Sequence, residues 1–424
     1  MNDVFEKFLK EWEITQEVHE KIQKRFERIT SKLDFCYYGK NSYYRTSLQV
    51  GSYGRGTAIK GVSDLDMIYI LPQEIKRRFD NYETNGQSQL LQEIKTCIKE
   101  SYPSTEIRGD GQVVVVSFYN GVVEVLPAFK KSDGSFCHLD THSGGSWKTT
   151  NPIPEILAID DINRKSGGLA FKLCKLLRVW KNEWGVKMNG LLIDSIVGKF
   201  LDTVEDFYPN DYAKTIQALF TYITQLKSQR FILAIGSNQQ VKIGDKIQKK
   251  AKKALKCIEE GEWKKLFGRG FPSIKQESYI FADCAKHVFR KTEEFIEDRF
   301  IVNIQYDLTI DCEVRQNGFR PFSLLERLEG MNSYFLKPNK ELIFSIKDFD
   351  GDEQLGEYKV FWKVLNRGNE AERRDAIRGQ IIEGEREHRE TTVFQGEHMV
   401  ECYVVCNNIV VARDRIKVPI SGKL

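Results

Sequence analysis

The sequence predicts an α+β fold in three parts: a mixed lobe of helices and strands over residues 1–150, a helical lobe over 151–300 and a β-rich module over 301–424. Three observations support this prediction. The first part alternates helical periodicity with short apolar strands, the second contains long amphipathic stretches, and the third shows a period of two, which is typical of strands. At 424 residues the chain is long enough for two or three domains.

Strand signals in the first part are short and clear. Residues 64–71, Asp-Leu-Asp-Met-Ile-Tyr-Ile-Leu, form an apolar run typical of a buried strand, and Pro72 ends it. Two valine-rich strands over 113–119 and 122–126 are separated by Asn120-Gly121, a strong signal for a two-residue hairpin. These patterns predict a sheet with antiparallel pairs in the first lobe.

Helical periodicity and the period of two divide the rest of the chain. Apolar residues recurring every three or four positions predict helices over 1–34, 86–100, 169–184 and 246–268. Alternation predicts strands over 301–314, 341–349, 357–366 and 398–420, the last around an Asn-Asn turn. Several short strands in sequence favour a sandwich-like module at the C-terminal end.

Composition narrows the function classes. The formal net charge is +4, which is too small to argue for nucleic-acid binding, so no obligatory nucleic-acid partner is expected. No run approaches 18 apolar residues and the N-terminus lacks a signal-peptide core, so we expect a cytoplasmic protein without a membrane partner. Nine irregularly spaced cysteines argue against a disulfide framework and against a zinc ribbon.

The chemistry centres on acidic residues in predicted strands. Asp64 and Asp66 are two residues apart, so on a strand they project to the same side, where their charges repel unless a cation lies between them. Glu124 is a lone acid within Val-Val-Glu-Val-Leu and is costly to bury unless something binds it. These three carboxylates predict two Mg²⁺ ions, with Mn²⁺ able to substitute, that activate a hydroxyl for attack on an α-phosphate.

A glycine-rich loop precedes the acidic strand. Gly51 lets the backbone approach a phosphate, and the Ser52 hydroxyl can donate to a terminal phosphate oxygen. Gly54, Arg55 and Gly56 extend the same cationic loop. An isolated Asp-x-Asp is a weak signal, but this loop, the strand-borne pair and the third acid together predict nucleotidyl transfer.

The segment GSYGRGTAIKGVSDLDMIYIL (51–71) resembles the signature of the nucleotidyltransferase superfamily that includes polymerase β, poly(A) polymerases, oligoadenylate synthetases and cyclic GMP–AMP synthase. VEVLPAF (123–129) resembles the third-acid segment of the last two and of the bacterial CD-NTases, the cyclic-oligonucleotide synthases of the anti-phage system CBASS. The resemblance implies a two-lobed polymerase-β-like fold whose helical second lobe closes the nucleotide cleft. The third acid is Glu124 where many members have Asp, and glutamate can still bind a metal.

Two further likenesses extend this resemblance. LCKLLRVWKNEW (173–184) is similar to the family's long helix with a Lys-x-Trp pattern, so Arg178 replaces the phosphate-binding lysine, or Lys175 one turn earlier takes its role. Residues 361–381 and 388–418 resemble the AGS-C sensor domain of CD-NTases through Asn366–Ala371, Arg378-Gly379 and Gly396–His398. The ligand of that module is not implied by any residue.

The predicted function is template-independent synthesis of a cyclic di- or trinucleotide messenger from NTPs, with ATP as one substrate, in CBASS defence. The implied partners are a downstream cyclic-nucleotide effector and regulatory CBASS proteins. Two alternatives stay open at this point: a linear oligonucleotide synthase or RNA-tailing enzyme, and nucleotidyl transfer to a protein or small molecule. A silent nucleotide-binding sensor would have no need for the three acids.

Overall fold

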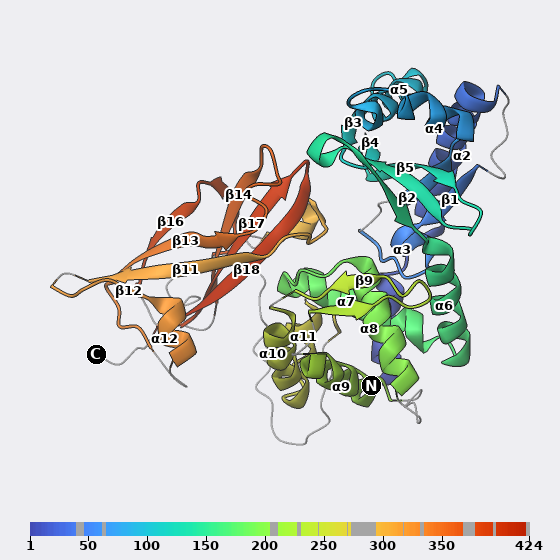
Figure 1. Ribbon diagram of the computed structural model, residues 1–424. Helices are drawn as coiled ribbons and strands as arrows, with labels where there is room; N and C mark the ends of the chain where they lie inside the picture. The colour runs from blue at the N-terminus through green and yellow to red at the C-terminus, as the bar shows by residue number, and fades with distance from the viewer. Residues whose placement is uncertain are drawn as a thin grey trace. The chain divides into compact units, whose positions relative to one another are not determined.

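The computed structural model describes residues 1–39, 46–61, 65–203, 211–226, 230–244, 246–268, 270–272, 294–316, 318–330, 335–367, 378–392 and 396–420. The chain divides into two compact units, whose elements are labelled in Figure 1. Unit 1 comprises Met1–Val179 and Asn189–Pro272, and unit 2 comprises Trp180–Met188 and Ser273–Leu424. The predicted three-part division at residues 150 and 300 stays a prediction.

A mixed seven-stranded sheet organises the N-terminal part of unit 1. Its main path runs β1-β2-β5-β4-β3, and β6 extends it by pairing with β5 and β7. β2 pairs with β5 in parallel, whereas the neighbouring pairs along the path are antiparallel. The strands are β1 (Ser47–Val50), β2 (Leu65–Ile70), β3 (Glu106–Asp110), β4 (Val113–Phe118), β5 (Gly121–Lys130), β6 (Phe136–Asp140) and β7 (Ser146–Thr150).

Helices cover one face of this sheet. α2 (Gln16–Tyr38) and α5 (Gly86–Ser101) pack against it, on the same side as seen in Figure 1. Alternate residues of β2 point to these helices, so Leu65 and Tyr69 are buried in the shared core. The side chain of Asp66 therefore projects from the opposite face of the sheet. α3 (Gly51–Gly54) and α4 (Gln73–Asp80) lie at the ends of β1 and β2 in the chain.

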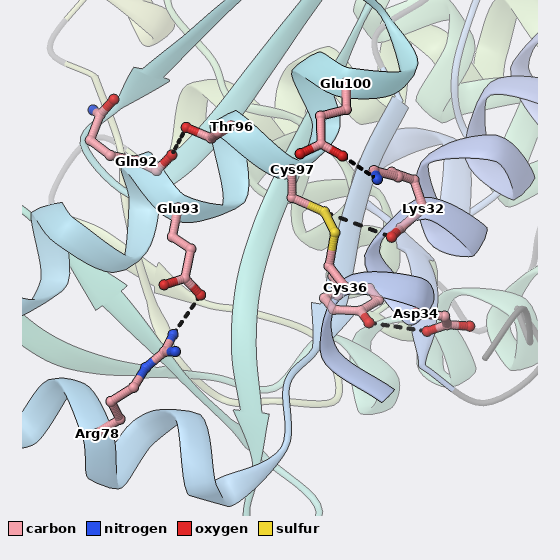
Figure 2. The surroundings of a disulfide bond; sticks show 10 residues. Lys32, Asp34, Cys36, Arg78, Gln92, Glu93, Thr96, Cys97 and Glu100 are labelled. Carbon is pink, nitrogen blue, oxygen red and sulfur yellow. Dashed lines mark hydrogen bonds and ion pairs between the residues drawn. A yellow bond between two sulfur atoms is a disulfide. The ribbon is translucent and has the colours of Figure 1, made fainter. Parts of the chain in front are cut away.

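A disulfide bond joins the two covering helices. Cys36 of α2 and Cys97 of α5 are bonded across a sequence separation of 61 residues, and Figure 2 shows the ion pair of Lys32 with Glu100, 2.6 Å, beside it. The irregular cysteine spacing argues against a disulfide framework and gave no sign of this bond. The two cysteines meet because the helices that carry them pack against the same sheet face.

The helical part of unit 1 holds the long helices that the periodicity predicts. The predicted helix over 169–184 is α7, while the one over 246–268 is divided into α10 and α11. The elements are α6 (Pro152–Lys165), α7 (Leu169–Trp184), α8 (Gly190–Thr203), α9 (Tyr212–Gln225), β8 (Phe231–Leu233), β9 (Gln240–Lys242), α10 (Ile247–Glu259) and α11 (Trp263–Phe267). The helical periodicity over 1–34 corresponds to two helices, because α1 (Asn2–Glu11) ends before Thr15 caps the start of α2.

Unit 2 is a β-sandwich, as the period of two predicts. A five-stranded sheet, β10-β18-β17-β14-β15, and a four-stranded sheet, β12-β11-β13-β16, contribute side chains to one shared core. β17 and β18 turn at Asn407-Asn408, both with positive φ. The elements are η3 (Ile296–Asp298), β10 (Ile301–Val302), β11 (Leu308–Arg315), β12 (Phe322–Ser323), α12 (Leu324–Gly330), β13 (Glu341–Phe349), β14 (Lys359–Arg367), β15 (Ile381–Gly384), β16 (Glu387–Thr391), β17 (Gly396–Cys406) and β18 (Ile409–Ile420).

The last turn of α7 and the residues after it belong to unit 2. Asn182 donates from Nδ2 to the carbonyl of Val302 at 3.3 Å, and Glu183 forms an ion pair with Arg415 at 3.5 Å. Trp180–Met188 is therefore an excursion of the chain out of unit 1 and back. Across the described ranges, no helix combines the length and apolar composition needed to cross a membrane.

Candidate active site

Two of the predicted metal ligands lie side by side. In the parallel pairing of β2 with β5, Asp66 stands opposite Glu124, so their Cα atoms are neighbours at the usual strand spacing of about 4.8 Å. Both side chains alternate with residues that enter the core, and both are half-buried. Asp64, the third predicted ligand, lies outside the described residues.

Gly51 fits directly against the Asp66 carboxylate. β1 ends at Val50, which pairs with Asp66, and Gly51 follows with φ +64°. A Cβ atom at residue 51 would lie 1.6 Å from Asp66 Oδ2. The position thus requires glycine for two reasons: its backbone is left-handed, and the carboxylate occupies the space of a side chain. The predicted approach of Gly51 to a phosphate stays a prediction, and the neighbour that the structure gives Gly51 is the predicted metal ligand Asp66.

Ser52 begins a tightly folded turn. Its carbonyl accepts hydrogen bonds from the backbone N–H groups of Thr57 and Ala58, at 2.9 and 3.1 Å. These bonds close the loop that contains Arg55 back onto the residue predicted to bind a phosphate. The loop therefore has a fixed geometry rather than an extended one.

Arg55 and Arg178 meet at a buried acid. Asp194, on α8, accepts from Arg55 Nε at 2.7 Å and from Arg178 Nη1 and Nη2 at 2.8 and 3.1 Å. Thr57 adds a hydroxyl donor to the same carboxylate at 3.1 Å. Asp194 is 0% exposed and each arginine is 6% exposed. Residues from three separate stretches of sequence thus form one buried cluster.

The start of α8 brings this cluster next to Ser52. A Cβ atom at Gly190 would lie 3.2 Å from Arg178 Nη2, 3.3 Å from Arg55 Nη2 and 3.9 Å from Ser52 Cβ. Both guanidinium groups and the serine side chain therefore converge on one backbone position. Arg178 Nη2 also donates to the Gly190 carbonyl, at 3.3 Å.

The charges in the cluster influence one another. Burial alone would raise the pKa of Asp194, but Arg178 and Arg55 outweigh it and keep that pKa below its ordinary value. Burial raises the pKa of Glu155, whose Oε2 is 3.8 Å from Arg55 Nη1, although Ser237 donates to its carboxylate. Asp194 is therefore the carboxylate that stays ionised beside the two arginines. Glu155 pairs with Arg55 only, and its raised pKa makes it the more easily protonated of the two acids.

Lys175 lies apart from the Asp194 cluster. Its ammonium is 3.8 Å from Glu13, and it lines a cavity of about 280 Å³ together with residues of α1 and with Lys172 of α7. The structure thus brings Arg178, rather than Lys175, next to Ser52. A nucleotide-binding role for Lys175, Arg55 or Arg178 stays a prediction.

The donor set suits a hard divalent cation. Adjacent aspartate and glutamate oxygens are ligands that Mg²⁺ and Mn²⁺ accept, and the absence of a side chain at Gly51 leaves room for the Asp66 carboxylate. The described residues contain no cluster of three metal-binding side chains, since the predicted set needs Asp64. The residues that are described fit the predicted metal site.

Sequence reasoning missed Asp194, Thr57 and Gly190. The signal for Asp194 is its place within Gly-Leu-Leu-Ile-Asp-Ser-Ile-Val, where a lone acid in an apolar helix must have a charged or hydrogen-bonding partner. The same argument singles out Glu124. The partners of Asp194 could not be read from the pattern, because Arg55 is 139 residues away.

The sensor-like motif of unit 2 forms a connected polar group. Asn366 and His398, opposite each other on β14 and β17, are hydrogen bonded at 2.8 Å. The Arg378 carbonyl accepts a hydrogen bond from the Asn366 N–H at 3.4 Å. The Arg378 guanidinium forms an ion pair with Glu390 at 2.9 Å. Residues 368–377 lie outside the described residues. These contacts connect β14, β16 and β17 with Arg378, so in the described residues the motif holds strands together.

Comparison with known proteins agrees with both parts of the resemblance. Residues 1–163 match the model of the Second Messenger Oligonucleotide or Dinucleotide Synthetase domain, and residues 290–421 match that of the Adenylyl/Guanylyl and SMODS C-terminal sensor domain. Over 303 residues, the chain is 20% identical to a protein of Bacillus cereus (strain VD146) named a probable cyclic nucleotide synthase. That similarity spans 59% of this chain and 88% of the relative.

A solved structure shares the fold. The chain is similar to CdnC of E. coli MS115-1, solved with ATP, with a TM-score of 0.50 and 16% identity. The match covers 64% of this chain and 98% of that chain. The predicted α+β nucleotidyltransferase fold with an added β-rich module is therefore confirmed.

Proposed function

We propose that this chain, which belongs to the CD-NTase class of cyclic-oligonucleotide synthases and carries a C-terminal AGS-C sensor domain, joins NTPs into a cyclic messenger and releases pyrophosphate. The observation that carries the proposal is the register of Asp66 opposite Glu124, with Gly51 against Asp66. Two carboxylates side by side on neighbouring strands, next to a serine-bearing tight turn, form the arrangement that nucleotidyl transfer needs.

Each residue has a distinct task. Asp66 and Glu124, together with Asp64, would hold Mg²⁺, or Mn²⁺ in its place. Bound divalent cations supply activation of the attacking ribose hydroxyl and neutralisation of the departing pyrophosphate. The Ser52 hydroxyl donates to the donor triphosphate, and Arg55 and Arg178 compensate its negative charge from positions next to Ser52.

The finer parts of the proposal concern product and partners. Successive transfers within one site would close a ring of two or three nucleotides, with ATP as one substrate. The messenger would act on a downstream effector in anti-phage defence, and CBASS regulatory proteins would control the synthase. We place the reaction in the cytoplasm because NTPs are supplied there.

One assay tests the product. The protein is incubated with four α-³²P-labelled NTPs and Mg²⁺ or Mn²⁺, treated with phosphatase and resolved by thin-layer chromatography. We expect a phosphatase-resistant product that Glu124→Gln does not make. A ladder of long products would favour linear synthesis or RNA tailing, and label on protein or on an added small molecule would favour transfer to that acceptor. Either of these results without a resistant product would refute cyclic synthesis.

A further inference from the structure

Asp194 holds together two arginines that are far apart in the sequence. It accepts from Arg55 through Nε and from Arg178 through both terminal nitrogens, at 2.7 to 3.1 Å. Bidentate pairing of a carboxylate with a guanidinium fixes the plane as well as the position of the arginine. Because Asp194 is fully buried, water does not compete for these bonds. The orientation of both arginines therefore depends on this carboxylate.

One terminal nitrogen of the two arginines is turned away from Asp194. Arg55 Nη2 makes no hydrogen bond within the described ranges, and it lies 3.3 Å from the Cβ position of Gly190. The terminal nitrogens of Arg178 are fully used, because Nη1 donates to Asp194 and to the Cys174 carbonyl, and Nη2 donates to Asp194 and to the Gly190 carbonyl. Ser52 Cβ lies 3.9 Å from the same Gly190 position. An anion bound by Ser52 would thus meet a donor from Arg55, while Arg178 holds Asp194 in place.

We infer that Asp194, itself held by Arg178, is a positioning residue that keeps Arg55 in the orientation in which it binds the triphosphate of the donor nucleotide beside Ser52. The nucleotide part of this inference rests on the proposed function. Asp194 itself does not touch the substrate. Gly190 contributes by the absence of a side chain, since any Cβ there would occupy the space between the donors.

The inference predicts a specific loss on substitution. Asp194→Asn keeps the shape of the side chain but replaces one oxygen by an NH₂ donor, which repels the guanidinium donors. We expect nucleotide affinity to fall at least tenfold, which corresponds to about 1.4 kcal/mol. Asp140→Asn is the matched control, because Asp140 is also a buried carboxylate of unit 1, 2% exposed and paired with Lys148.

Binding is measured by equilibrium dialysis with radiolabelled α,β-methylene analogues of the four NTPs, which cannot be transferred, and folding is checked by thermal unfolding. Arg55→Met and the double variant with Asp194→Asn complete a cycle. If Asp194 acts through Arg55, the double variant binds less weakly than the product of the two single effects predicts. Asp140→Asn should lower the melting temperature without weakening nucleotide binding.

Each outcome has one meaning. Wild-type affinity in Asp194→Asn, equal weakening in Asp140→Asn, or effects that multiply in the double variant would overturn the inference and leave cyclic synthesis untouched. Weak binding in Asp194→Asn by an enzyme that makes no cyclic product would support the inference and refute the proposed product. Failure of the wild-type protein to bind any analogue would overturn both.

A further variant covers the case in which Asp194→Asn does not fold. Arg55→Lys keeps a buried cation for Asp194, but a single ammonium cannot pair with Asp194 and reach the phosphate site as a planar guanidinium does. We expect this variant to bind the analogues at least fivefold more weakly. Wild-type affinity in Arg55→Lys would overturn the inference.

Discussion

Gly51→Ala should remove activity by displacing a metal ligand rather than by unfolding the lobe. The added methyl would lie 1.6 Å from Asp66 Oδ2 and 2.6 Å from Cγ. Non-bonded heavy atoms keep about 3.5 Å apart, so the carboxylate or the backbone must shift by roughly 2 Å. Metal–ligand distances tolerate changes of only about 0.2 Å. A misplacement of even about 1 Å can cost about 100-fold in rate, so we expect at least that loss of turnover.

The backbone part of the effect can be separated from the collision. Gly51 has φ +64°, and alanine in this left-handed region costs about 1 kcal/mol by itself. Gly39 has φ +66°, and among the described residues no atom lies within 4 Å of its Cβ position, so Gly39→Ala imposes the same backbone strain without a collision with any of them. Turnover and melting temperature are measured for both variants over a titration of Mg²⁺. Turnover of Gly51→Ala within about threefold of Gly39→Ala would refute this account, because the collision was expected to cost far more.

Three further outcomes follow from the described contacts. Mn²⁺ at 100 times its dissociation constant should stabilise the wild-type protein by about 2.7 kcal/mol, whereas Glu124→Gln and Asp66→Asn should show little shift in thermal unfolding; an equal shift in the variants would remove them from the metal site. Reducing the bond between Cys36 and Cys97 with dithiothreitol should cost about 4 kcal/mol of unfolding free energy, and the Cys36→Ser variant should not respond to the reductant; an unchanged wild-type melting temperature would contradict this. Because the pKa of Asp194 is lowered in the folded protein, its stabilisation is complete above its ordinary pKa of 3.8 and is lost as the pH falls through the folded value. The difference in melting temperature between wild type and Asp194→Asn should therefore stay constant above pH 3.8 and shrink only at lower pH, and a difference that grows towards acid would reverse the assigned sign.

Local patterns predicted the elements of the catalytic lobe well. The hairpin at Asn120-Gly121, the buried strand after Asp64 and the helix over 169–184 depend on near neighbours in the sequence, and the structure contains all three, as β4–β5, β2 and α7. The pairing of Asp66 with Glu124 is different, because it depends on a parallel crossover between distant strands. The cost of burying unpaired acids, supported by the resemblance, indicated that these carboxylates act together, but the register that makes them neighbours could not be read from the sequence.

The Asp194 cluster and the disulfide were not predictable from spacing. Asp194 and Arg55 are separated by 139 residues, and Cys36 and Cys97 by 61. Such partners are decided by how whole helices pack. A single sequence does not show which residues of two packed helices face each other. The break between α1 and α2 was missed for a local reason: apolar positions continue on both sides of Thr15, and the cap is a weaker signal than the periodicity.

The excursion Trp180–Met188 gives the two units a thermodynamic link. Its ends are bordered by Arg178 and Gly190, which are hydrogen bonded to each other in unit 1, while its middle is held in unit 2 by Val302 and Arg415. If the segment has two arrangements, a molecule that binds unit 2 and favours one of them also changes the free energy of the arginine pair. Linkage is reciprocal, so a nucleotide bound beside Ser52 would then change the affinity of unit 2 for that molecule by the same factor. Measuring the affinity of unit 2 for such a molecule with and without nucleotide would thus report on nucleotide binding without any turnover.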